Sequence, residues 1–307
     1  MEKIRTDLAI EAHEMCSKEK AEKTEVRGVT VTEEERNGVF VTVIEIKDKN
    51  GEAELGKPMG KYITIEVPDI KFSDDAQKNA SEIISEQIKN ICKITEDTKT
   101  LVVGLGNDMI TPDALGPKVV SQLMVTNHIK TYMQELLDES YSSVCAIVPG
   151  VLGTTGIETI DIIRGVASKI NPELIICVDA LATRSVNRIS TTVQISDTGI
   201  SPGSGVENKR EEISEKSVGA KVISIGVPTV VDAATIASDS IDAVIESDRE
   251  LKHACSGISR SSIIKKALLG GEENMMVTPK DIDLVIRRSA KAVADGINLA
   301  LHNGASF

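Results

Sequence analysis

Four short runs of aliphatic residues, separated by amphipathic segments, constrain the fold of this chain more than any other feature. The runs cover residues 100–107, 143–150, 173–181 and 220–228. Continuous Val, Ile and Leu over such lengths is typical of strands buried on both faces. Helical spacing appears in residues 117–129, 157–170 and 231–247. The pattern predicts an α/β fold with a doubly wound, mainly parallel sheet and crossover helices.

The segments before residue 100 predict additions to this sheet. Residues 1–25 favour a helix, and a helix over 73–92 is expected to be capped by Ser73 or Asp74. Between them, β-branched residues and Gly or Pro turn signals predict a small antiparallel β element at about 26–70. Its strands are expected over 39–48, 49–58 and 61–69.

The C-terminal part predicts further helices. Thr278, Pro279 and Asp281 have the order of an N-cap, a first helical position and a capping-box acid, so a helix is expected to start there. No internal repeat or clear linker interrupts the chain, which favours one domain with decorations.

Composition excludes several function classes. Asp and Glu exceed Lys and Arg by 47 to 35, which gives a formal net charge of −12 and argues against direct nucleic-acid binding. No apolar stretch is long enough for a membrane span or a signal peptide, so a cytoplasmic protein is expected. The five scattered cysteines favour reduced thiols over disulfides.

Aspartates follow the predicted strands, where ligands bind in open α/β sheets. Asp113 follows the first run and Asp179 the third. If these strands are neighbours, the carboxyl groups face each other, and one keeps a proton because two close carboxylates do not both ionise cheaply. Such a pair supplies an acid and a base for hydrolysis. The alternative for each is a structural role, which for Asp113 is capping the following helix.

A second aspartate motif, Asp197-Thr198-Gly199, is like the signature of pepsin-type proteases. That fold is all-β and needs two such triplets, whereas this chain has one within an α/β pattern. The alternative is an Asx turn leading into a Gly-rich loop over 199–210, either an active-site flap or a plain connection.

Five sequence blocks carry a resemblance over almost the whole chain. They are VVGLGN…TPDALGP, PGVLGTTGIET, DALATRS, QISDTGISPGSGVENKR and IGVPTVVDAATI, in that order. The chain strongly resembles the germination proteases of spore-forming Firmicutes, endopeptidases that degrade small acid-soluble spore proteins.

The resemblance implies a fold related to hydrogenase-maturation proteases, a zymogen, a homotetramer, and action in the spore core. The two essential acids of the family fall on Asp113 and Asp179, so one carboxyl is expected to polarise the scissile carbonyl while the other activates water. No metal or other cofactor is expected. Substrate contacts are expected from loops 149–158 and 197–210, with candidates Gly150, Thr154, Thr155, Asp197, Gly203 and Ser204.

The resemblance also implies a role for the N-terminal residues. The family cuts after an acidic residue, before an apolar residue and then Ala, and Asp7-Leu8-Ala9 has this form. The sequence therefore predicts self-cleavage between Asp7 and Leu8, with residues 1–7 as propeptide and 8–307 as the peptidase domain. Ile4 stands where the family prefers an acid, which predicts a slow reaction. The alternative is an ordinary N-terminus.

Two rival functions stay open at this point. One is a maturation-type peptidase that recognises one metalloenzyme subunit through its metal. The other is a binding module that keeps the fold but has no turnover.

Overall fold

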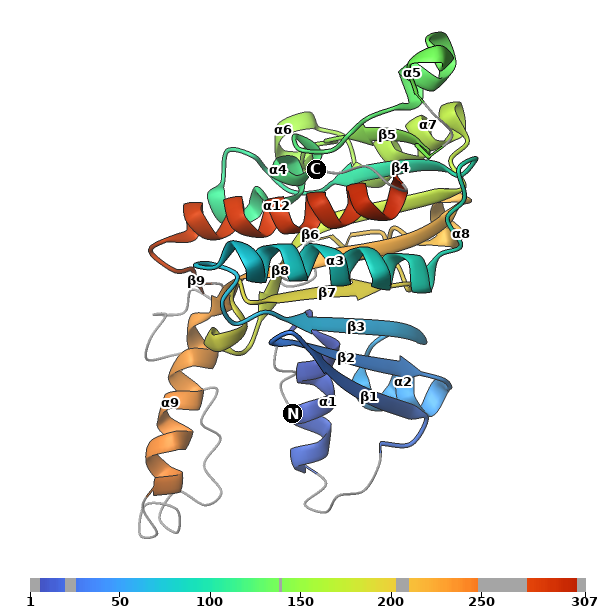
Figure 1. Cartoon of the computed structure of the whole chain (residues 1–307). Helices are drawn as coiled ribbons and strands as arrows, with labels where there is room; N and C mark the ends of the chain where they lie inside the picture. Colours follow the sequence, from blue (N-terminus) through green and yellow to red (C-terminus); the bar gives the residue numbers. More distant parts are fainter. Residues whose placement is uncertain (1–5, 20–25, 138–139, 203–209, 248–274, 303–307) are drawn as a thin grey trace.

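In the part of the chain that the computed structural model describes, residues 6–19, 26–137, 140–202, 210–247 and 275–302, one nine-stranded sheet forms the centre (Figure 1). Its order is β1-β2-β3-β7-β8-β6-β4-β5, with β9 paired to β8. The strands are β1 (Val29–Arg36), β2 (Val39–Ile46), β3 (Gly60–Glu66), β4 (Lys99–Gly104), β5 (Ser143–Ile147), β6 (Leu174–Thr183), β7 (Thr192–Ser196), β8 (Lys221–Asp232) and β9 (Met276–Val277).

The sheet has a parallel half and an antiparallel half. Strands β8, β6, β4 and β5 pair in parallel, and each is formed by most of one aliphatic run. Strands β1, β2, β3 and β7 pair antiparallel, and β7 joins the halves through β8. The expected α/β class is confirmed, but the sheet is mixed rather than mainly parallel, because the N-terminal β element continues it instead of standing apart.

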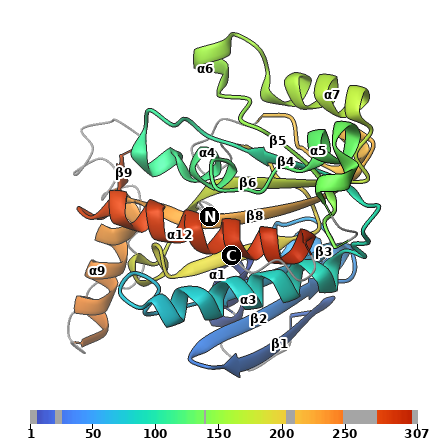
Figure 2. The ribbon, with the colours of Figure 1, turned by 45° about the horizontal axis from the view of Figure 1, so that its top comes forward.

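Helices cover both faces of the sheet (Figure 2). Helices α3, α4 and α12 pack together on one face. On the other face, α7 covers the parallel half and α1 and α2 cover the antiparallel half. The helices are α1 (Ala9–Glu19), α2 (Lys49–Leu55), α3 (Asp74–Ile91), α4 (Leu115–Val120), α5 (Asn127–Tyr132), α6 (Leu152–Thr155), α7 (Thr159–Ile170), α8 (Glu215–Val218), α9 (Ala233–Ser247) and α12 (Ile282–Leu301), with the 3-10 turns η1 (Thr111–Asp113), η2 (Gln134–Leu136) and η3 (Val186–Arg188).

The prediction of a strand over 49–58 is wrong, since most of this segment forms α2. The Asp48 carboxylate accepts hydrogen bonds from the backbone N–H groups of Asn50 and Gly51, which caps the helix, and Gly56 ends it in the left-handed conformation. Asn50-Gly51 therefore lies in the first turn of a helix instead of a hairpin. The sequence does not predict strand β1, because its Glu-rich end interrupts the alternation of apolar and polar residues with which the strand begins.

Two expectations about helices need correction. Helix α12 begins at Ile282, and the hydroxyl of Thr278 donates to the carbonyl of Thr229 instead of capping the helix. Helix α9 follows β8 directly but extends away from the sheet, so it is not a crossover helix (Figures 1 and 2). The helix over 73–92 is confirmed, with the Ser73 hydroxyl accepting from the Ala76 N–H.

Candidate functional site

A cavity of about 670 Å³ lies over the sheet where its two halves meet. Its lining comes from β6, β7 and β8, from the loops after β4 and β5, and from the α2–β3 connection. The lining includes Asp7, Lys57, Asp113, Gly150, Asp179 and Gln194. The cavity therefore collects polar groups from segments far apart in the sequence.

Asp113 is held by a loop that closes on itself after β4. The backbone N–H of Asn107 donates to the Asp113 carboxylate at 2.8 Å and lies 3.1 Å from its carbonyl oxygen. Helix α4 has Ala114 at its N-cap and no side-chain cap, so the alternative role for Asp113 as a helix cap is wrong. Burial raises the pKa of Asp113, and the Asn107 hydrogen bond partly offsets that rise.

Asp179 lies within β6, and not at its end as expected, because β6 continues to Thr183. Strand β4 is the neighbour of β6 and is shorter, with its last residue, Gly104, opposite Val178. Asp179 therefore lies one residue beyond the end of β4, where the Asp113 loop begins. Its side chain is 8% exposed.

The surroundings of Asp179 favour its protonated form. Burial raises the pKa of Asp179 well above the usual range, and the negative charges of Asp113 and Asp7 add to the rise. The backbone N–H of Ala180 donates to the carboxyl group at 2.9 Å and opposes the rise. The site thus contains one strongly perturbed acid beside a less perturbed one, the arrangement needed for acid–base chemistry.

Residues 6–8 form a bend that leads into α1, and Asp7 lines the cavity. The Asp7 N–H donates to the Ala182 carbonyl at 3.0 Å, and the Ala182 N–H donates to the Asp7 carboxylate at 2.8 Å. Leu8 is fully buried in an apolar cluster with residues of α1, β2 and β3. The peptide bond between Asp7 and Leu8 is therefore fixed at the cavity wall.

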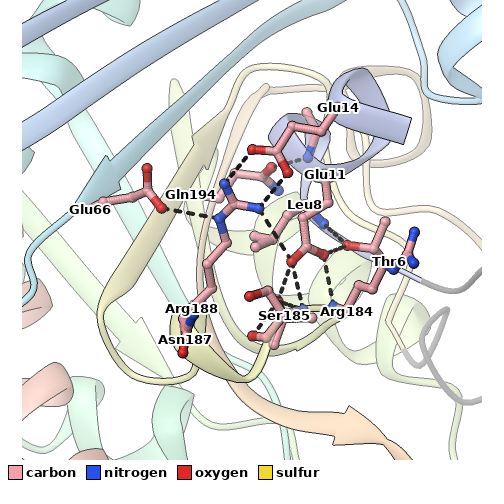
Figure 3. Close-up of polar contacts among 12 residues, drawn as sticks. Thr6, Leu8, Glu11, Glu14, Glu66, Arg184, Ser185, Asn187, Arg188 and Gln194 are labelled. Atoms are coloured by element: carbon pink, nitrogen blue, oxygen red, sulfur yellow. Dashed lines mark hydrogen bonds and ion pairs between the residues drawn. The ribbon is translucent and has the colours of Figure 1, made fainter. Parts of the chain in front are cut away.

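Glu11 anchors the start of α1 through several hydrogen bonds (Figure 3). Its carboxylate is 2% exposed and accepts hydrogen bonds from the hydroxyls of Thr183 and Thr6 and from the backbone N–H groups of Arg184 and Ser185. The guanidinium of Arg188 lies 3.5 Å away and also contacts Glu14 and Glu66. Glu11 thus satisfies several donors that would otherwise be buried unpaired.

Replacing Glu11 with glutamine is expected to lower the free energy of unfolding by about 2–4 kcal/mol, because the amide NH₂ would face N–H donors and Arg188 would lose a buried partner. The matched control is Glu14→Gln on the same helix, whose 45% exposed side chain forms an ion pair expected to contribute about 1 kcal/mol or less. Denaturant unfolding of both variants measures the difference. Equal losses in the two variants would contradict the anchoring role of Glu11.

The other residues predicted to contact substrate differ in whether they line the cavity. Gly150 and Val151 line the cavity, whereas Thr154 and Thr155 do not, and their hydroxyls donate to the carbonyl of Val151. The Asp197 carboxylate accepts from the Lys61 N–H. Gly203 and Ser204 lie outside the described residues.

Sequence reasoning missed Lys57 and Gln194. Gln194 is a buried amide in β7, where polar residues alternate with Val193 and Ile195, and Lys57 lies between Gly56 and Pro58 after α2. A polar residue is ordinary at this position of an alternating strand, so no local signal marks Gln194, and none marks Lys57.

No group of three or more His, Cys, Asp or Glu side chains in the described ranges is arranged to hold a metal ion. None of the helices in those ranges is both long and apolar enough to cross a membrane.

Comparisons with known proteins agree with one another. The sequence profile described as "Germination protease" matches residues 9–262. The chain is 44% identical to the germination protease of Clostridium tetani, over 97% of this chain and 95% of the relative. Identity is 45% with the germination protease of Caldanaerobacter subterraneus, over 98% and 95%, and 40% with that of Priestia megaterium, over 98% and 94%.

Proposed function

The chain belongs to the germination protease family, and from this premise we propose that it degrades small acid-soluble spore proteins in the core of the germinating spore. As a member of this family it is a peptidase that acts in spore germination. The finer proposal is an endopeptidase that cuts after Glu or Asp and before an apolar residue followed by Ala. A homotetrameric assembly, implied by the resemblance, belongs to the same proposal.

The proposed chemistry is hydrolysis by the Asp113–Asp179 pair without a covalent intermediate. Asp179 carries the proton, since its pKa is raised further than that of Asp113. Asp113 is ionised and accepts a proton from the attacking water. The two carboxyls titrate as a coupled pair, so the pH dependence of the rate belongs to the pair rather than to either residue.

We further propose that the protein is a zymogen that cleaves itself between Asp7 and Leu8 and so releases residues 1–7. The observation that carries this proposal is the position of that peptide bond. It lies at the wall of the cavity that contains Asp113 and Asp179, and the Asp7 carboxylate is close enough to raise the pKa of Asp179. Residues 6–8 thus lie where a substrate would bind, and they block that place in the uncleaved chain.

A peptide experiment tests the substrate rule. The protein, after incubation that allows self-processing, is mixed with a peptide of residues 2–14 and with the same peptide carrying Asp7→Asn. We expect cleavage of the first peptide between Asp and Leu, identified by mass spectrometry, and none of the second. Failure to cut this peptide and others with Glu before Ile-Ala or Phe-Ala would overturn the proposed endopeptidase.

A further inference from the structure

We propose that Lys57 and Gln194 bind the carbonyl oxygen of the residue that is cleaved and stabilise the negative charge which that oxygen gains during hydrolysis. This inference rests on the proposed function and deepens it. It assigns to two residues, one after α2 and one in β7, a role that the carboxyl pair was expected to fill.

The contacts of the Asp7 carbonyl carry the proposal. Its oxygen accepts a hydrogen bond from the Lys57 ammonium at 3.0 Å and from the Gln194 side-chain amide at 3.1 Å. Both donors are side chains, an ammonium group and an amide NH₂ group. Both come from segments remote from residue 7, so the pair is a feature of the folded protein and not of a local turn.

The orientation of the Gln194 amide is fixed by a second contact. The backbone N–H of Ala9 donates to its Oε1 atom at 2.7 Å, and an N–H group needs an acceptor. The NH₂ end of the amide must therefore face the Asp7 carbonyl. One side chain thus holds the backbone on both sides of the Asp7–Leu8 bond.

The sheet register explains how Gln194 and Asp179 come to share the cavity. Gly226 of β8 is opposite Asp179 of β6 on one side and opposite Gln194 of β7 on the other. Laterally paired residues point to the same face of a sheet, so the carboxyl and the amide project together across a glycine that has no side chain. The donors and the proposed acid therefore lie on one surface.

Lys57 is placed by the end of α2. Gly56 turns the chain in the left-handed conformation, and the ammonium then reaches the carbonyls of Asp7 and Thr6. Burial lowers the pKa of Lys57, while the negative charges of Asp7 and Glu11 oppose that change. A cation in such a partly water-excluded place stabilises a developing anion more strongly than an exposed one does.

The chemical step balances with these groups. The oxygen of water bonds to the Asp7 carbonyl carbon, its proton passes to Asp113, and the π electrons move onto the carbonyl oxygen between Lys57 and Gln194. The electron pair on the oxygen then re-forms the C=O bond as the C–N bond breaks, and the Leu8 nitrogen keeps the bonding pair and takes the proton of Asp179. Because the oxygen already has two donors, the proton of Asp179 is free for the leaving nitrogen.

The test measures the first-order rate of self-cleavage of the full chain by intact mass. Lys57→Met and Gln194→Glu are each expected to slow it about 10²–10³-fold, the usual cost of one lost oxyanion donor. Lys57→Arg keeps a cationic donor, so its rate of self-cleavage is expected to fall less than that of Lys57→Met. The matched controls are Lys47→Met and Gln134→Glu, at exposed positions away from the cavity, with unchanged rates.

A pH profile separates a chemical role from a structural one. The carboxylate introduced by Gln194→Glu accepts from the Ala9 N–H but offers no donor to the Asp7 carbonyl, until it is protonated at low pH. The rate relative to wild type is therefore expected to recover as pH falls, while hydrogen exchange at the Ala9 amide stays as slow as in wild type. A ratio of variant to wild-type rate that does not change with pH, together with faster hydrogen exchange at the Ala9 amide, would show a merely structural role and overturn the inference.

The outcomes also separate this inference from the proposed function. If wild type cleaves itself, Asp179→Asn does not, and Lys57→Met and Gln194→Glu both cleave within about threefold of wild type, the inference fails alone. If wild type does not cleave itself, the zymogen proposal and this inference fail together.

Discussion

Replacing Asp179 with asparagine is expected to lower the rate of peptide cleavage by about 10²–10⁴-fold, because the proposed general acid is lost. Asparagine is nearly isosteric, and its Oδ1 atom still accepts from the Ala180 N–H. The fold is therefore expected to remain intact. Asp113→Asn removes the proposed base and is expected to have a comparable effect on the rate.

The same substitution is expected to raise the melting temperature at pH 7. An unfolded aspartate ionises near pH 4, whereas Asp179 in the folded chain keeps its proton to a higher pH. The folded state therefore binds more protons above about pH 4, and the free energy of unfolding falls as pH rises through this range. Asparagine does not ionise, so Asp179→Asn avoids this fall in the free energy of unfolding. The substitution should therefore stabilise the protein at pH 7, and the stabilisation should become smaller toward pH 4.

Thermal unfolding at several pH values, together with a cleavage assay, checks both effects. Activity of wild type is expected to fall at low pH, where Asp113 gains a proton, and at high pH, where Asp179 loses its own. Retention of substantial activity by both Asn variants would rule out the carboxyl pair. A melting temperature for Asp179→Asn that is lower than wild type at pH 7 would contradict the buried, protonated state of Asp179.

Replacing Gly106 with alanine is expected to lower the free energy of unfolding by about 2–4 kcal/mol and to abolish most of the activity. Gly106 has φ +104°, which L side chains rarely adopt. A Cβ atom there would lie 2.0 Å from the Asp113 carbonyl oxygen and 3.1 Å from its carboxylate. The loop must therefore move, and Asp113 moves with it.

Gly165→Ala is the matched control for this variant. Gly165 lies in α7, and a Cβ atom there would meet no atom within 4 Å. Because alanine favours a helix by about 1 kcal/mol over glycine, this variant is expected to be slightly more stable and fully active. Denaturant unfolding and peptide cleavage of both variants measure the contrast. Unchanged activity in Gly106→Ala would show that the Asp113 loop needs no glycine.

Part of this site was predictable from the sequence because it depends on strand order. Asp113 and Asp179 follow aliphatic runs in the sequence, and the strands that these runs form, β4 and β6, are neighbours. The exact end of β6 was not predictable, because β6 continues beside β8 after β4 has ended. An aliphatic run shows that a strand is buried, but only its partners determine where it stops.

Lys57 and Gln194 were not predictable for a different reason. Their positions depend on α2 in place of an expected strand and on the pairing of β7 with β8. Each is a long-range relation that no local pattern encodes. The Asp7–Leu8 bond was suggested by its likeness to a family cleavage site, and its position at the cavity depends on contacts between residues more than a hundred positions apart.

The most direct test of the account is the intact mass of the purified full chain after incubation between about pH 4.5 and 8, with Asp179→Asn in parallel. The account predicts that wild type loses the mass of residues 1–7 over part of this range and that Asp179→Asn keeps its full mass at every pH. An unchanged mass of wild type throughout, or equal processing of both proteins, would contradict it.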